Sequence, residues 1–169
     1  KAHVAYNGGN NEWYTPADIV EAARTVLGEI DLDPASSDAA NKIVKASAYY
    51  TAADDGLSKP WRGRVWMNPP YETGLIEKFT ARLRECFDAD EVSEAIVLVN
   101  NATETRWFQN LAASASMLCL VTGRIRFWSE TKETASPLQG QAILYFGVRR
   151  EAFARGFRPF GIIWERPAQ

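Results

Sequence analysis

Four consecutive residues, Asn68-Pro69-Pro70-Tyr71, carry the side chains of this sequence best suited to chemistry. The two prolines donate no backbone N–H and hold φ at about −65°, so they form a stiff turn whose carbonyl groups can accept hydrogen bonds. Asn68 adds a neutral amide oxygen, and Tyr71 adds a flat ring on which a planar group can stack. The turn is suited to receive an N–H₂ group attached to a planar ring or to an amide. A rigid strand-to-helix connection is the alternative interpretation.

A second polar segment, Asp33-Pro34-Ala35-Ser36, also follows a predicted strand. The apolar residues predict strands over 29–33 and 64–67, and prolines after each of them prevent a central strand from continuing. In an open parallel sheet, ligands bind beyond the carboxyl ends of the strands, near the point where the strand order reverses. We therefore expect the two polar segments to line one crevice.

The rest of the chain alternates helical and strand patterns. Thr15 and Pro16 predict a helix start, with Thr15 as N-cap and Pro16 at the first helical position, and Gly28 predicts its end. Further elements are expected as helices over 72–87 and 103–113, a short helix and a short strand between 37 and 63, strands over 95–99, 117–121 and 141–148, and a β-rich tail over 157–164. This alternation predicts an α/β fold whose doubly wound, mostly parallel sheet is covered by helices on both faces.

Length and composition are those of one folded domain. The 169 residues are 46% apolar, which is enough to bury a core without disulfides. We predict a flexible, glycine-rich lead-in over residues 1–11 and a single domain over residues 12–169. Charge is distributed unevenly along the chain. Residues 1–56 contain four Lys/Arg and nine Asp/Glu, a net charge of −5, whereas residues 57–169 contain fifteen Lys/Arg and twelve Asp/Glu, a net charge of +3. The C-terminal part can therefore present a basic face to nucleic acid although the net charge is −2.

Several classes of protein are not expected. Two cysteines and one histidine are too few for a disulfide framework or for a Cys/His zinc site, so we expect no metal. No run of 18 apolar residues and no secretory signal is found, so we expect no membrane span and a cytoplasmic location.

An ordered set of motifs resembles one known family. The set comprises Trp13-Tyr14-Thr15-Pro16, Asp31-Leu32-Asp33-Pro34-Ala35-Ser36, Asp54-Asp55-Gly56-Leu57, Asn68-Pro69-Pro70-Tyr71 and Gly123-Arg124-Ile125-Arg126-Phe127. Over residues 12–148 the chain resembles the phage and prophage DNA N6-adenine methyltransferases. The resemblance implies a Rossmann-like methyltransferase fold, S-adenosylmethionine as methyl donor with S-adenosylhomocysteine as product, no metal, and DNA as partner.

The resemblance also implies roles for individual residues. Asn68, Pro69, Pro70 and Tyr71 would be catalytic: the Asn68 side chain and the Pro69 carbonyl would accept the hydrogens of an adenine amine, and Tyr71 would stack on the flipped base. The residues implied to bind the cofactor are Trp13, Tyr14, Thr15, Pro16, Asp33, Pro34, Ala35, Ser36, Asp55 and Asn68. The chain departs from the usual pattern after Asp33, where Ala35-Ser36-Ser37 stands in place of a glycine-rich GxG.

Four residues of the C-terminal part are candidates for contacts with DNA: Arg124, Arg126, Gln139 and Gln141. Arg124 and Arg126 alternate with apolar residues, so both guanidinium groups should leave one strand face and reach phosphates, although surface arginines are often only solvated. Loops over 129–140 and 46–62 offer few side chains for reading bases, which favours a short or relaxed target site. Trp107 and Phe108 are expected in the core.

Other functions fit the same turn. It could present a cytosine N4 amine, an RNA base or a protein glutamine amide to the methyl donor. A catalytically silent methyltransferase-like binding module is a further alternative. The sequence leaves the choice between monomer and homodimer open.

Overall fold

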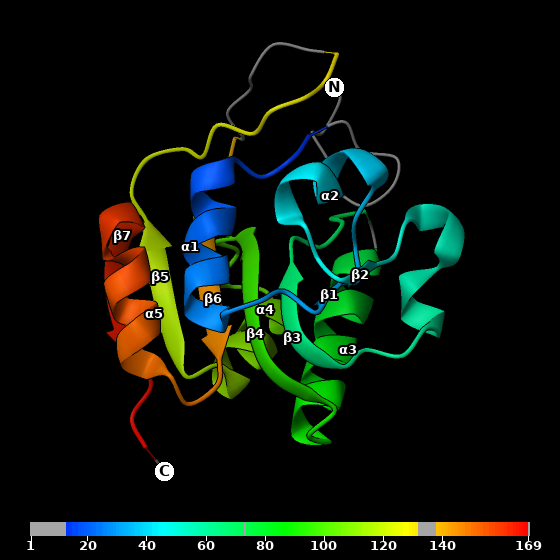
Figure 1. The fold of residues 1–169 in the computed structure, drawn as a ribbon. Coiled ribbons are helices and arrows are strands. Elements are labelled where there is room, and N and C mark those ends of the chain that lie inside the picture. The colour runs from blue at the N-terminus through cyan, green and yellow to red at the C-terminus, as the bar shows by residue number, and fades with distance from the viewer. Residues whose placement is uncertain (1–12, 73, 132–137, 169) are drawn as a thin grey trace.

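A computed structural model describes residues 13–72, 74–131 and 138–168, so the predicted lead-in over residues 1–11 lies outside the described residues. Within these ranges seven strands form one sheet in the order β2-β1-β3-β4-β6-β5-β7 (Figure 1). The strands are β1 (Leu32–Asp33), β2 (Ala48–Tyr49), β3 (Gly63–Met67), β4 (Val92–Asn100), β5 (Met117–Val121), β6 (Gln141–Phe146) and β7 (Gly161–Glu165).

The two halves of the sheet differ in strand direction. β1 pairs in parallel with β2 and β3, and β3 pairs in parallel with β4. β6 is antiparallel to both β4 and β5, and β7 is antiparallel to β5. The prediction of a mostly parallel sheet is therefore correct for the first half only. Parallel neighbours need a crossover, usually a helix, and the described part of the connection from β5 to β6 contains no helix, so β6 returns antiparallel between β5 and β4.

Helices cover both faces of the sheet, as the sequence predicts. They are α1 (Ala17–Leu27), α2 (Asp38–Val44), α3 (Leu75–Asp88), α4 (Arg106–Ser114) and α5 (Arg150–Phe157), with short 3₁₀ turns η1 (Ala52–Asp54), η2 (Gly56–Ser58) and η3 (Arg158–Phe160). Alternate residues of β4 point to opposite faces. Ile96 and Leu98 pack in the core beneath α1 and α5, and Val97 and Val99 pack in the core beneath α3 and α4.

Helix α5 was not predicted, because only a β-rich tail was expected in this part of the chain. Its apolar residues Phe153, Ala154 and Phe157 are buried at helical spacing, and the Phe153 and Phe157 rings stack at 4.7 Å. Four arginines over 149–158 interrupt this short apolar pattern. Tertiary packing against α1 and β5 therefore decides the helix more than the local pattern does.

The start of α1 also differs from the prediction. Pro16, and not Thr15, is the N-cap, and no side chain caps the helix. Thr15 is buried, and its hydroxyl accepts a hydrogen bond from the side-chain amide of Asn68. Gly28 ends the helix with φ of 84°, as predicted. The predicted helix over 72–87 begins later, at Leu75, because Gly74 precedes it in a left-handed conformation with φ of 84°.

Candidate active site

The ends of β1 and β3 lie side by side and bring the two polar segments together. Leu32 pairs with Val65, so Asp33 at the end of β1 and Asn68 just after β3 occupy the same edge of the sheet. Asp33 is 2% exposed and Asn68 is 7% exposed. Both line a cavity of about 20 Å³ together with Tyr14, Thr15, Ala35, Ala40, Val44 and Trp66. The shared crevice that the sequence predicts is therefore present.

The strand order reverses at this crevice. β2 lies on one side of β1 and β3 lies on the other. Helix α2, which follows β1, packs against α1, whereas α3, which follows β3, packs against α4 on the opposite face. Ligands bind at such a switch point in open α/β sheets.

Four hydrogen bonds hold the side chain of Asn68 and the segment beside it. The Asn68 Nδ2 group donates to Thr15 Oγ1 at 3.0 Å. The Trp128 indole N–H donates to the Thr15 carbonyl at 2.9 Å, and Tyr14 and Trp128 exchange backbone hydrogen bonds at 2.8 and 3.0 Å. The segment over 13–16 is thus held between Asn68 and Trp128. Trp128 was not among the predicted site residues, although it follows the Gly123–Phe127 motif directly.

The Asp33 side chain is buried and accepts a hydrogen bond from the turn that follows it. The Ala35 N–H donates to Asp33 Oδ1 at 3.2 Å. Burial raises the pKa of the Asp33 carboxyl to about 7, while hydrogen bonds from the Ser36 side chain and the Ala35 N–H oppose the rise. The Ser36 N–H donates to the Tyr50 carbonyl at 2.8 Å. Two of the backbone donors in the segment that replaces the usual GxG, the N–H groups of Ala35 and Ser36, are therefore engaged within the protein. Asp33 changes charge near neutral pH.

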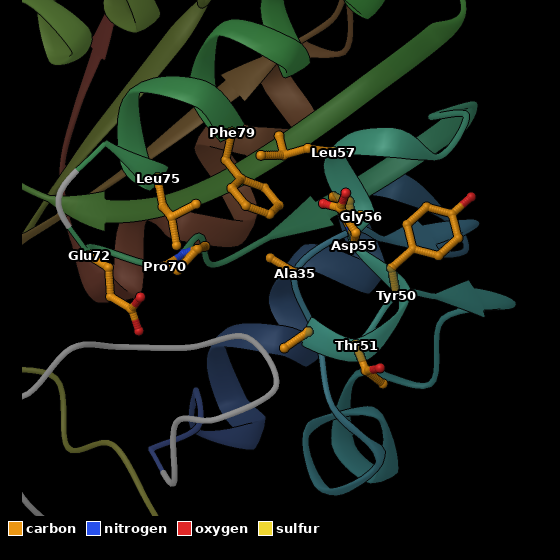
Figure 2. A pocket seen from close by; sticks show the side chains of 12 residues that line it. Ala35, Tyr50, Thr51, Asp55, Gly56, Leu57, Pro70, Glu72, Leu75 and Phe79 are labelled. Atoms are coloured by element: carbon orange, nitrogen blue, oxygen red, sulfur yellow. The ribbon is translucent and has the colours of Figure 1, made fainter.

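A second cavity of about 160 Å³ adjoins the first, because Ala35 lines both. Figure 2 shows it between Leu75 and Phe79 of α3 on one side and the 50–57 segment on the other. Its walls combine apolar groups with hydroxyl and carboxylate groups. They are formed by Pro34, Ala35, Tyr50, Thr51, Ala52, Asp55, Gly56, Leu57, Pro70, Glu72, Leu75 and Phe79.

The turn that carries Asp55 is packed tightly against the loop after β1. Gly56 is buried, and a Cβ atom at this position would lie 2.3 Å from the Pro34 carbonyl oxygen, so only glycine fits. The Trp61 indole N–H donates to the Gly56 carbonyl at 2.8 Å. Asp55 itself is exposed at the rim, with φ of 52°. This packing places one carboxylate beside the cavity.

Tyr71 is half-buried, and contacts at its hydroxyl group and at its ring hold the side chain. Its hydroxyl oxygen accepts the backbone N–H of Asn100 at the end of β4. Its ring lies edge-on to Trp107, with centroids 6.3 Å apart. Trp107 is only partly buried and borders the site, whereas its neighbour Phe108 is buried, as predicted.

Gln141 lies inside the sheet. It is 2% exposed, and its Nε2 group donates to Asn100 Oδ1 at 2.7 Å. A side chain so enclosed supports the strand end that holds Tyr71, and in this arrangement it offers no surface for the DNA contact that the sequence analysis expected of it. Gln139 is exposed.

Arg124 and Arg126 are exposed, whereas Ile125 and Phe127 are 5% and 0% exposed. The predicted alternation is therefore correct, although the segment belongs to none of the strands named above and follows the end of β5. Of the loop expected over 129–140, residues 132–137 lie outside the described residues.

Two features are not found in the part of the chain that the structure describes: a cluster of metal-binding side chains and a membrane-spanning helix. Over 13–72, 74–131 and 138–168, no group of three or more His, Cys, Asp or Glu side chains could hold a metal ion. No helix within these ranges has the length and apolar character needed to cross a bilayer.

The comparison with known proteins identifies one family. Residues 5–154 match the family model described as DNA N-6-adenine-methyltransferase (Dam). No curated protein matches the chain. The matched range includes both strand-end segments, Asp55 and the arginines at 124 and 126, and it ends before β7.

Proposed function

The chain belongs to the DNA N-6-adenine-methyltransferase (Dam) family, and on that premise we propose that it transfers a methyl group from S-adenosylmethionine to the N6 amine of an adenine extruded from DNA. Family membership implies DNA adenine methylation in general. The methyl donor, the flipped base, the Rossmann-like methyltransferase architecture and the roles of individual residues are the finer parts of the proposal.

One observation carries it: the side-chain amide of buried Asn68 is held by Thr15 beside Asp33, at the point where the strand order reverses. Because Nδ2 donates to Thr15, the amide plane is fixed. A fixed amide can present its oxygen to a substrate amine with no reorganisation during the reaction. A turn that merely connected a strand to a helix would not require such an anchored amide.

Asn68 and Pro69 would activate the amine. The exocyclic amine of adenine is a poor nucleophile, because its lone pair is delocalised into the ring. Asn68 Oδ1 and the Pro69 carbonyl would accept its two hydrogens and localise the lone pair on nitrogen. The methyl group that S-adenosylmethionine supplies would then be transferred to this nitrogen, with S-adenosylhomocysteine as the leaving group and one amine proton released to solvent water. Positioning and electrostatics supply the rate enhancement, without a covalent enzyme intermediate.

The residues present fit S-adenosylmethionine, which when bound supplies an electrophilic methyl carbon on a sulfonium. The larger cavity has apolar walls in Leu57, Pro70 and Phe79 that suit a flat adenine ring, and Thr51 and Asp55 could bind ribose hydroxyl groups. The smaller cavity begins at Ala35 and leads to the Asp33 carboxyl. Ionised Asp33 would attract the positively charged end of the cofactor, near the segment over 13–16.

Tyr71 would hold the extruded base. Stacking of a base on an aromatic side chain is worth about 1–3 kcal/mol. The ring of Tyr71 directly follows the two prolines, and its hydroxyl is tied to the end of β4. We propose that this anchor sets the angle of the ring, so that the base lies flat beside the Asn68 amide.

The exposed Arg124, Arg126 and Gln139 are the proposed contacts to DNA. The two guanidinium groups would bind phosphates, which position the protein without reading sequence. Binding should then weaken steeply with salt, by counterion release. Gln141 is assigned a positioning role through Asn100, because it is buried.

Product analysis tests the proposal. The protein is incubated with methyl-labelled S-adenosylmethionine and, separately, with unmethylated DNA, RNA and a glutamine-containing protein, and the labelled nucleosides or residues are identified by mass spectrometry. N6-methyladenine in DNA is the expected product. N4-methylcytosine, label in RNA or protein alone, or cofactor binding with no transfer would each contradict the proposal and identify a different function.

A further inference from the structure

In the part of the chain that the structure describes, strand β7 leaves an apolar face of the sheet largely exposed. It is the last strand of the sheet, beside β5, and lies at the left edge in Figure 1. Trp164 pairs with Leu118, and Ile162 pairs with Leu120. Trp164 and Ile162 are 61% and 66% exposed. The opposite face of the strand is covered, because Ile163 packs into the core beneath α5.

The free edge of β7 also carries backbone groups directed away from β5. The N–H of Thr122 donates to the carbonyl of Phe160, and the N–H of Arg166 donates to the carbonyl of Ser116. Hydrogen-bonded pairs alternate along an antiparallel ladder. Residues 161, 163 and 165 therefore direct their N–H and C=O groups toward the open edge, which is a template for another strand.

This edge is complementary to itself. If a second β7 lies antiparallel with Ile163 opposite Ile163, residue 161 of each copy faces residue 165 of the other. These three pairs, with two hydrogen bonds each, would satisfy every outward backbone group of both strands. In the same register, Ile162 of each copy would lie beside Trp164 of the other copy. The exposed apolar side chains of the two copies would therefore cover one another.

Charges along the neighbouring groove follow the same symmetry. A groove of about 560 Å³ between α5 and β7 is lined by Glu151 and Arg158, among others. Helix α5 runs antiparallel to β7, because Arg150 at its start bonds Glu165 at the end of β7 at 2.6 Å. Arg158 therefore lies near residue 161 and Glu151 lies near residue 165. The two-fold axis would bring Arg158 of each copy toward Glu151 of the other.

We propose that β7 is the interface of a symmetric homodimer, in which the two sheets join edge to edge through antiparallel β7 strands. A second copy is favoured over an unrelated peptide because backbone groups, apolar side chains and charges all match under one two-fold axis. Strand β7 and Arg158 lie outside the range of the family match, whereas Glu151 lies inside it. The interface is remote from Asn68, since β4, β6 and β5 all lie between β3 and β7 in the sheet. Dimer formation is therefore independent of the methyl-transfer site.

Sedimentation analysis tests this proposal. The chain, at concentrations from about 1 to 100 µM, should sediment at twice its mass of 18.9 kDa. Ile162→Lys should weaken self-association at least about tenfold, because it places a charge against Trp164 of the other copy. Leu138→Lys, at another exposed apolar side chain, is the matched control and should leave association unchanged.

A charge exchange makes the test specific for the two-fold arrangement. Arg158→Glu should weaken the dimer, and Arg158→Glu combined with Glu151→Arg should restore it. Every variant should stay folded by circular dichroism and keep its methyl transfer, because the methyl-transfer site includes none of the four positions changed. A wild-type monomer at every concentration would overturn the proposal, whether or not a different protein binds this edge. So would a dimer that neither Ile162→Lys nor Arg158→Glu weakens.

Discussion

Replacing Asp33 with asparagine should remove a large part of the pH dependence of this protein's stability. Asp33 is 2% exposed, and burial raises the pKa of its carboxyl from 3.8 to about 7. Asparagine has nearly the same shape and keeps an oxygen that can accept the hydrogen bond from the Ala35 N–H, but it does not titrate. The difference between wild type and Asp33→Asn therefore isolates the ionisation of this one group.

The sign and size of the effect follow from linkage. When folding raises the pKa of a carboxyl group, the folded state binds its proton more tightly than the unfolded state does. The resulting contribution to the free energy of unfolding is complete below the unfolded pKa and is lost as the pH rises through the folded pKa. For Asp33 the loss runs from pH 3.8 to about pH 7. A shift of about three pKa units corresponds to about 4 kcal/mol over the whole window, of which about 3 kcal/mol falls between about pH 5 and pH 8.

Urea unfolding at several pH values between about 5 and 8 measures the effect. The free energy of unfolding of Asp33→Asn, relative to wild type, should increase by about 3 kcal/mol across this range. Asp88→Asn, at an exposed aspartate that ends α3, controls for the removal of a surface carboxylate. A difference between Asp33→Asn and wild type that stays constant with pH would refute the assignment of Asp33 as a buried group that ionises near neutrality.

Substitutions at three further positions test the contacts around the site. Thr15→Val should lower the turnover number by about tenfold, because it removes the acceptor that orients Asn68, whereas Thr15→Ser should stay near wild type; equal rates would contradict this. Tyr71→Ala should reduce single-turnover methylation more than Tyr71→Phe, which loses only the hydroxyl anchor; equal losses would assign the whole effect to the hydroxyl. Gly56→Ala should lower the free energy of unfolding in urea by about 1–3 kcal/mol, because its Cβ meets the Pro34 carbonyl, and an unchanged value would show that the turn can move away.

The sequence predicts the parts of this fold that depend on local pattern. The apolar stripe of α1 and the stop at Gly28 lie within one helix, so periodicity and a single glycine suffice to locate them. The ends of β1 and β3 are marked by prolines directly after apolar residues. Because ligands bind at strand ends in open α/β sheets, these local signals are enough to locate the shared crevice.

The remaining features depend on contacts between distant parts of the chain. Trp128 reaches the Thr15 carbonyl across 113 residues of sequence, and Gln141 reaches Asn100 across 41. No local pattern encodes either contact, which is why Trp128 was missed and Gln141 was assigned to the surface. Thr15 was predicted to cap α1 for the same reason, since a buried amide 53 residues away takes its hydroxyl instead.

The order of the strands is likewise a long-range property. The apolar run at residues 141–148 predicts a strand, but its insertion between β4 and β5 reverses its direction. Helix α5 was missed because arginines surround its few apolar residues, and only packing against α1 and β5 shows which side of the segment is buried.

Single-turnover methylation of DNA by Asn68→Ala shows whether Asn68 acts on the substrate amine. Asn110→Ala, at an exposed position of α4, is the matched control, and calorimetry with S-adenosylmethionine measures cofactor binding separately. Asn68→Ala should lose more than about 90% of the N6-methyladenine formation rate, or at least about 1.4 kcal/mol of transition-state stabilisation. Its cofactor affinity should stay within about threefold of wild type. An Asn68→Ala variant that binds cofactor normally and methylates adenine at more than about a tenth of the wild-type rate would contradict this role of Asn68.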